Sequence, residues 1–129
     1  MSYIPGTNIT YNWVAPSQGL EQMRLTKRPG LFYFYNPRDS KTAYLFEAKL
    51  FEKCLKVGDE FVTMKWDSTQ KLPVKGLRMP KGATGIMLLD YTGKRIGATI
   101  TRPPTPAAFM KLVAKAREKN KKKIETAKK

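Results

Sequence analysis

The sequence predicts an α/β fold in which helices flank a central mixed sheet of four strands. Three observations predict it. An aromatic strand is joined to a second strand by a long amphipathic segment, which is typical of parallel strands linked by a helix. Two further strands form a hairpin, and a helix with a proline near its start closes the fold. A length of 129 residues suits one domain that folds without disulfides or metals.

The chain opens with a polar, irregular segment followed by a short helix. Ile9–Trp13 alternates weakly, and one interpretation makes it a fifth strand at the N-terminal edge of the sheet. Pro16 marks the helix entry, and the helix is expected to end near Gly30. Its apolar positions are Leu20, Met23 and Leu25.

The first clear strand is Leu31–Tyr35, a continuous apolar and aromatic run that indicates burial on both faces. A polar turn follows, in which Asp39 or Ser40 can cap the next helix by accepting backbone N–H bonds. We expect that helix over Lys41–Val57, with Gly58 as its stop. Its apolar stripe consists of Ala43, Phe46, Leu50, Cys54 and Val57, which predicts a buried structural thiol at Cys54.

The second half of the chain supplies three strands. Glu60–Trp66 alternates and predicts a strand. Asp67–Gly82 contains two prolines and two glycines and predicts a long connection. Gly85–Asp90 and Lys94–Ile100 then form a hairpin around a tight turn.

The closing helix is expected to begin at Pro106 with Thr105 as its cap. Its apolar stripe consists of Phe109, Leu112, Val113 and Ala116. Beyond Asn120 the segment has almost no apolar content and is expected to fray. The predicted organisation is therefore an N-terminal extension over residues 1–12, a folded domain over residues 13–119 and a lysine-rich tail over residues 120–129.

Positive charge is the strongest signal in the composition. The net charge is +15, from 25 basic and 10 acidic residues. Lys111–Lys129 holds nine basic and two acidic residues, so the body of the chain is basic as well as its end. Such an excess favours an acidic macromolecule as partner, nucleic acid before acidic protein. The residues expected to contact phosphates are Lys115, Arg117, Lys119, Lys121, Lys122, Lys123, Lys128 and Lys129.

The amino-acid composition excludes several kinds of catalytic and metal site. The chain has no histidine, and its only cysteine is Cys54, which excludes imidazole catalysis, Cys/His zinc sites and an intrachain disulfide. We expect no metal and no cofactor. No signal peptide and no apolar segment of membrane-spanning length is visible, so a cytoplasmic protein is expected.

The order helix, strand, helix, strand, loop, hairpin, helix resembles that of the thioredoxin fold. "TYNWVAPSQGLEQMRLTKRPGLFYFYN" resembles the opening of bacterial thioredoxin-like domains, and "LFEAKLFEKCLKVGDEFVTMKWDST" their following helix and strand. "GATGIMLLDYTGKRIG" is similar to the hairpin of the family. The resemblance covers about Trp13–Lys119.

The resemblance implies a family member without redox chemistry. The family's CxxC motif would fall on Asp39-Ser40-Lys41-Thr42, so Asp39 and Thr42 replace both cysteines. Dithiol chemistry needs a thiolate at the helix start and a second thiol one turn later. The family's cis-proline would fall near Thr84, or at Gly85 in an alternative register, and a trans peptide bond is expected there.

Three functions follow as hypotheses. The first is a non-catalytic thioredoxin-like module that contacts an RNA or DNA backbone electrostatically as a subunit of a larger assembly. The second is a scaffold subunit that docks an acidic protein through the former active-site face (residues 36–42 and 78–84) and the basic tail. The third, a residual enzyme relying on Cys54, is disfavoured because that thiol lies on a predicted buried face.

Overall fold

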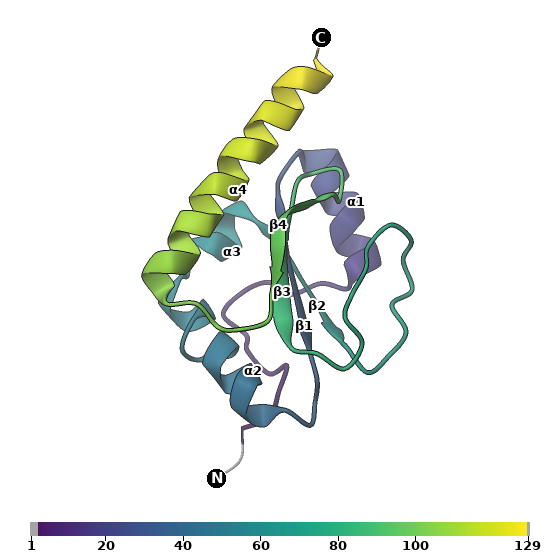
Figure 1. The fold of residues 1–129 in the computed structure, drawn as a ribbon. Helices are drawn as coiled ribbons and strands as arrows, with labels where there is room; N and C mark the ends of the chain where they lie inside the picture. Colours follow the sequence, from purple (N-terminus) through teal and green to yellow (C-terminus); the bar gives the residue numbers. More distant parts are fainter. Residues whose placement is uncertain (1–2, 129) are drawn as a thin grey trace.

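A four-stranded mixed sheet in the order β2-β1-β3-β4 forms the centre of the computed structural model, which describes residues 3–128 (Figure 1). The α/β prediction is confirmed. The elements in chain order are α1 (Pro16–Thr26), β1 (Gly30–Tyr35), α2 (Ser40–Glu47), the 3-10 turn η1 (Phe51–Lys53), α3 (Val57–Glu60), β2 (Val62–Asp67), β3 (Gly85–Leu89), β4 (Arg95–Ile100) and α4 (Pro106–Ala127).

The sheet is mixed because only its first pair of strands is joined by a crossover. β1 pairs with β2 in parallel, Phe32 opposite Met64, and pairs with β3 antiparallel. β3 and β4 form the predicted hairpin. Residues 30–34 of β1 are buried, as the continuous apolar run predicts for a central strand.

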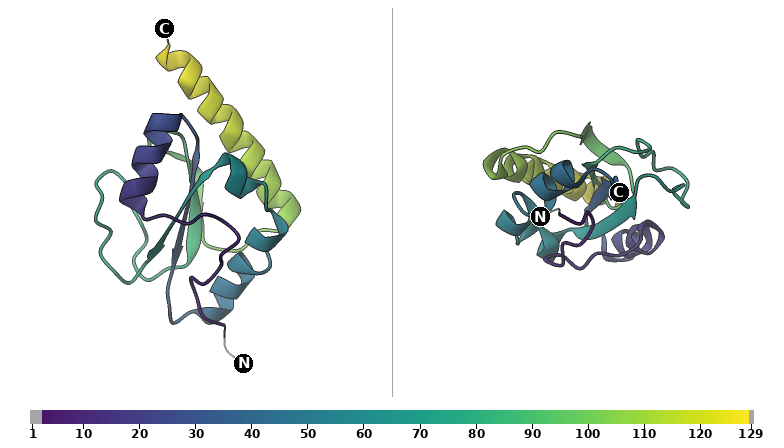
Figure 2. Two further views of the ribbon diagram at one scale, coloured as in Figure 1. Left: turned by 180° about the vertical axis from the view of Figure 1, so that it is seen from behind. Right: turned by 90° about the horizontal axis from the view of Figure 1, so that it is seen from below.

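Alternate side chains of the sheet enter two separate cores, and helices cover both faces (Figure 2). On one face Leu31 and Tyr33 pack with α2, η1, α3 and α4. On the other face Phe32 and Phe34 pack with Met23 of α1 and with the connection between β2 and β3. The molecule therefore has three layers, with the sheet in the middle.

The N-terminal segment does not supply a fifth strand within the described residues. Its one β-bridge to the sheet joins Val14 and Met64 at the β2 edge. Farther upstream, the backbone N–H groups of Gly6 and Asn8 donate to the Glu47 carboxylate instead of to a strand. Gly6 and Asn8 are thus bonded to a side chain of α2, and the segment forms no ladder with β2 beyond the bridge at Val14.

The helix expected over Lys41–Val57 is broken into α2, η1 and α3, so this prediction is wrong. At the first break the Glu47 carbonyl accepts a hydrogen bond from Asn8 Nδ2 at 3.3 Å. At the second break the Cys54 carbonyl accepts one from the Tyr11 hydroxyl at 2.6 Å. The N-terminal segment thus satisfies the carbonyls that a continuous helix would have used. Gly58, which was expected to end the helix, lies inside α3.

The closing helix is longer than expected. Thr105 caps it as predicted, accepting from Ala108 N–H at 3.2 Å. However, the helix continues through the expected tail to Ala127. The reason is Asn120, which is only 4% exposed and bonds two other parts of the fold: its Oδ1 accepts from Tyr91 N–H at 2.7 Å and its Nδ2 donates to the Lys27 carbonyl at 3.1 Å.

Candidate functional site

The turn after β1 is fastened to the segment that precedes β3. Asn36 N–H donates to Thr84 Oγ1 at 3.0 Å, and Asn36 Nδ2 donates to the Gly82 carbonyl at 2.9 Å. Arg38 N–H donates to Asn36 Oδ1 at 2.9 Å. The structure therefore places Thr84 beside Asn36, at the start of the turn that leads to residues 39–42.

Asp39 is the residue that caps α2. Its Oδ1 accepts from Thr42 N–H at 3.2 Å, so the cap prediction is confirmed for Asp39. Thr84 is 5% exposed, and no cis peptide bond occurs within residues 3–128, which confirms the trans bond expected there. Residues 39–42 therefore begin α2 with a carboxylate cap and contain no thiol.

Asp39→Ala is expected to lower the free energy of unfolding by about 1 kcal/mol, because the α2 start loses its side-chain acceptor. Asp39→Asn keeps an acceptor oxygen and should lose much less. Urea denaturation of both variants measures the difference. Equal stability of Asp39→Ala and the unmodified protein would show that the cap contributes nothing.

Cys54 lies in the core, away from solvent, as predicted. It is 5% exposed and belongs to the same buried cluster as Phe51 and Val57. Burial raises the pKa of its thiol. A buried thiol with a raised pKa is a poor nucleophile.

An apolar groove of about 850 Å³ runs beside the turn. One wall is the start of α2 and the other is the N-terminal segment. Its lining residues are Tyr3, Ile4, Thr7, Ser40, Lys41, Tyr44 and Leu45. Ile4 is 68% exposed, so this groove presents apolar surface to solvent beside the turn at residues 39–42.

Beneath this groove lies a buried carboxylate that the sequence analysis did not single out. Glu47 is fully buried, and its two oxygens accept four hydrogen bonds. The donors are the Tyr3 hydroxyl at 2.7 Å, Gly6 N–H at 2.7 Å, Asn8 N–H at 2.9 Å and the Tyr33 hydroxyl at 2.6 Å. Burial, followed by the Glu47 charge, raises the pKa of the Tyr33 hydroxyl. This cluster holds the N-terminal segment on the domain.

The predicted phosphate-binding residues divide between different sides of α4. Lys119, Lys122 and Lys123 line a hollow of about 430 Å³ between α4 and the β3–β4 hairpin, the α4–hairpin hollow. The helical spacing places exposed Lys115 one turn before Lys119 on the same side. Lys121 and Lys128 are exposed but do not line this hollow, and Lys129 lies outside the described residues.

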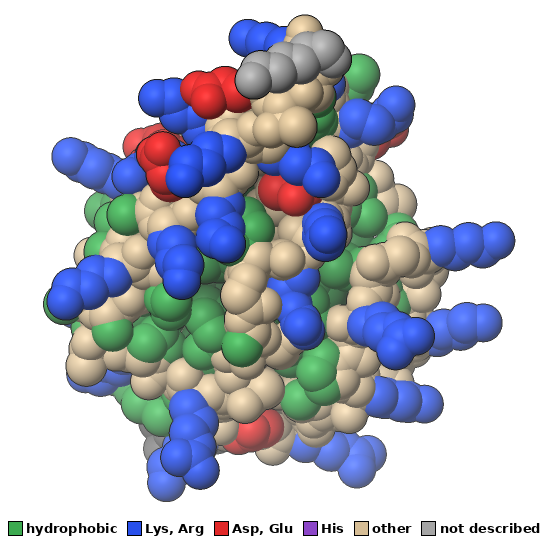
Figure 3. All heavy atoms as spheres, turned by 45° about the horizontal axis from the view of Figure 1, so that its top comes forward, with side chains coloured by type: hydrophobic (Ala, Val, Ile, Leu, Met, Phe, Trp, Pro, Cys, Tyr) green, Lys and Arg blue, Asp and Glu red, His purple; other side chains and the backbone are tan. Residues whose placement is uncertain are grey.

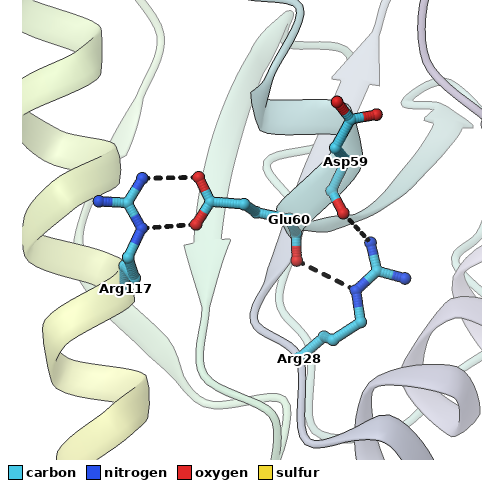
Figure 4. A network of polar contacts seen from close by, with 4 residues as sticks. All are labelled: Arg28, Asp59, Glu60 and Arg117. Atoms are coloured by element: carbon cyan, nitrogen blue, oxygen red, sulfur yellow. Dashed lines mark hydrogen bonds and ion pairs between the residues drawn. The ribbon is translucent and has the colours of Figure 1, made fainter.

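Arg117 points away from the hollow toward α3. Its guanidinium meets the Glu60 carboxylate through two hydrogen bonds, Nε–Oε2 at 2.5 Å and Nη2–Oε1 at 2.7 Å (Figure 4). Arg28 holds the same element from the opposite side, donating to the carbonyls of Asp59 and Glu60 at 3.1 Å each. Arg117 was expected to contact phosphates, but its guanidinium is paired with Glu60 and links α4 to α3.

Arg117→Gln is expected to raise the pKa of Glu60 toward its ordinary value of 4.5, because the hydrogen bonds from Arg117 are what lower it. The stabilisation from this pair is present above pH 4.5 and is lost as the pH falls through the lower, folded-state pKa. Since both side chains are well exposed, its loss should cost at most about 1 kcal/mol. NMR titration of the Glu60 carboxyl carbon measures the shift; an unchanged pKa would contradict the assignment.

The α4–hairpin hollow also contains two cations that the sequence analysis did not assign to a site, Lys94 and Arg95. Its one acid is Asp90, which is 6% exposed and accepts hydrogen bonds from Thr92 and Lys94 N–H. Within residues 3–128 none of these five cations has an acidic partner, because the ion pair found there joins Arg117 to Glu60. The position of Lys94 and Arg95 directly after the hairpin turn is the feature of the sequence that could have indicated their role.

Lys and Arg side chains spread over the face that carries the C-terminal end of α4, whereas Asp and Glu occupy few places on it (Figure 3). In the part of the chain that the structure describes, no group of three or more Cys, Asp or Glu side chains is placed to hold a metal ion. No helix among residues 3–128 combines the length and apolar character required to cross a bilayer. No protein-family model and no curated protein matches the sequence.

Proposed function

We propose that this protein is a non-catalytic, thioredoxin-like module that binds the phosphate backbone of nucleic acid, as a basic subunit of a larger assembly. The order of helices and strands supports the thioredoxin-like interpretation. The capped turn, which offers no thiol, supports a role without dithiol chemistry. Cytoplasmic localisation belongs to the same proposal.

The α4–hairpin hollow is the observation that carries the binding proposal. Lys119, Lys122 and Lys123 of α4 face Lys94 and Arg95 of the hairpin across it. Five cations in one concave site attract phosphates more strongly than the same charges spread over a convex surface. Contacts of this kind are made with phosphates and not with bases, so binding should not depend on the nucleotide sequence.

Salt dependence tests this proposal. We expect a fluorescein-labelled single-stranded oligonucleotide to bind at about 50 mM salt. The logarithm of the association constant should fall against the logarithm of salt with a slope of about −3.5, the value for five phosphate contacts on a single strand. Lys119→Gln combined with Lys122→Gln should make the slope shallower by about 1.4.

Lys53→Gln combined with Lys56→Gln is the matched control. Both lysines are exposed and neither lines the α4–hairpin hollow, yet the change in net charge is the same. Absence of binding at low salt would overturn the proposal. So would an equal loss of affinity in the control and in the α4 variant, because the effect would then come from net charge alone.

The apolar groove beside the former active-site turn favours a second candidate function. Apolar Tyr44 and Leu45 lie next to Lys41 in this groove, a combination that suits an acidic protein segment with apolar side chains. Leu45→Glu should abolish capture of such a partner while leaving the salt-dependent binding of oligonucleotides unchanged. A partner that remains bound to Leu45→Glu would exclude this groove as its site.

A further inference from the structure

We propose that the site takes a single strand of nucleic acid, whose backbone runs from the α4–hairpin hollow across the β3–β4 hairpin and on to α1. This inference rests on the proposed function and adds its path and the form of the ligand. The path consists of three neighbouring hollows that share lining residues. The second and third are lined by residues outside the basic C-terminal segment.

The second hollow, the loop–hairpin hollow, has a volume of about 590 Å³ and lies between the hairpin and the connection from β2 to β3. It shares Lys94, Arg95 and Gly97 with the α4–hairpin hollow. Arg78 adds a third cation, and no acid lines it. A backbone that leaves the first hollow over Lys94 and Arg95 therefore enters a second basic one.

The third hollow, the α1–loop hollow, has a volume of about 510 Å³ and lies between α1 and the same connection. It shares Gly76, Leu77 and Gly93 with the loop–hairpin hollow, so the two hollows are neighbours. Arg24 and Lys75 are its cations, and Glu21 is its one acid.

The charge along this path is strongly one-sided. Eight cations line the three hollows: Arg24, Lys75, Arg78, Lys94, Arg95, Lys119, Lys122 and Lys123. The acids are Glu21 and the buried Asp90, whose carboxylate is occupied by hydrogen bonds from its own turn. A polyanion that follows the whole path thus meets cations in every hollow.

The shape of the path favours a single strand over a duplex. Each hollow has the volume of a small-ligand site, which matches a few atoms of backbone or one nucleotide rather than a helix. The hollows lie on different sides of the hairpin, so a ligand must bend sharply to fill all three. A duplex is stiff over about 150 base pairs and would contact one side. A single strand bends freely enough to follow the turn.

The path lacks an exposed aromatic platform for bases. Tyr91 lies in the α1–loop hollow but is only 7% exposed, and the Lys27 ammonium covers its ring at 4.6 Å from the centroid. Stacking on aromatic rings is the usual source of base preference in single-strand binding. Oligonucleotides of different base should therefore bind this path with the same affinity.

The test uses the charge reversal Lys75→Glu with Arg78→Glu, two exposed residues of the outer hollows. Fluorescence anisotropy compares oligo(dT) and oligo(dA) of about 16 and about 4 nucleotides with a duplex of about 16 base pairs. We expect the long single strand to lose about tenfold or more in affinity at 50 mM salt, and the short one to lose little because it fits the α4–hairpin hollow. The control is Lys53→Glu with Lys56→Glu, and circular dichroism verifies folding of each variant.

The outcomes separate this inference from the proposed function. If the Lys75/Arg78 variant binds the long strand as the control does, while Lys119→Gln with Lys122→Gln still weakens it, the path is wrong and the proposed function stands. Tighter binding of the duplex than of the long strand would overturn the single-strand assignment. If the unmodified protein binds no nucleic acid at low salt, the proposed function itself fails. Should the charge reversal unfold the protein, Lys75→Gln with Arg78→Gln answers the same question.

Discussion

Glu47→Ala is expected to lower the free energy of unfolding by about 3–5 kcal/mol. The substitution removes the acceptor of four hydrogen bonds in a site closed to solvent. The Tyr33 hydroxyl and Asn8 N–H would then remain buried without a partner, at about 1–3 kcal/mol for each unsatisfied group. The cavity left by the side chain adds to this loss.

Urea denaturation measures the effect, and Glu52→Ala is the matched control because Glu52 is an exposed glutamate of the neighbouring η1 turn. Combining Glu47→Gln with Tyr33→Phe in a double-mutant cycle isolates the contact between these two side chains. If Glu47→Ala were no more destabilising than Glu52→Ala, the carboxylate cluster would not be what fastens residues 3–8 to the domain.

Glu47 also shows why part of the fold could not be predicted from the sequence. Three of its four donors lie in the N-terminal segment, 39 to 44 residues earlier in the chain. A glutamate between the apolar positions of a helix indicates a solvent-facing residue, because periodicity reports only local neighbours. The same long-range contacts supply the partners that break the predicted helix at Glu47 and at Cys54.

The strands were predictable because their signals are local. The apolar run at Leu31–Tyr35 and the alternation before Trp66 need no knowledge of distant residues. The hairpin is likewise encoded by a short turn between two β-prone runs. All three predictions depend on the spacing of residues that are close in the sequence, and the structure confirms them.

The candidate site was predictable only in its half on α4. A cluster of lysines such as Lys119, Lys122 and Lys123 is visible as composition, whereas Lys94 and Arg95 are two ordinary basic residues beside a turn. The hairpin half becomes part of the site because α4 continues past Asn120 and lies against the hairpin. That continuation depends on the buried side-chain amide of Asn120. From the sequence alone, the helix was expected to fray beyond this residue.

Asn120→Ala is therefore expected to cost about 2–3 kcal/mol and to loosen the second half of α4. Tyr91 N–H loses its partner in a buried position, and the Lys27 carbonyl loses its partner in a partly buried one. Hydrogen exchange of residues 121–127 should become faster, while residues 106–116 remain protected because Phe109 and Val113 stay in the core.

Loosening α4 should also weaken oligonucleotide binding, although Asn120 carries no charge. Lys122 and Lys123 would no longer be held opposite Lys94 and Arg95, so each phosphate contact would have to order a flexible segment first. Asn120→Asp is the sharper comparison: it keeps the acceptor for Tyr91 N–H, loses the donor to the Lys27 carbonyl and adds a negative charge. If Asn120→Ala speeds exchange but binds oligonucleotides as tightly as the unmodified protein, the lysines of α4 act as a flexible chain of charges and the α4–hairpin hollow is not the site.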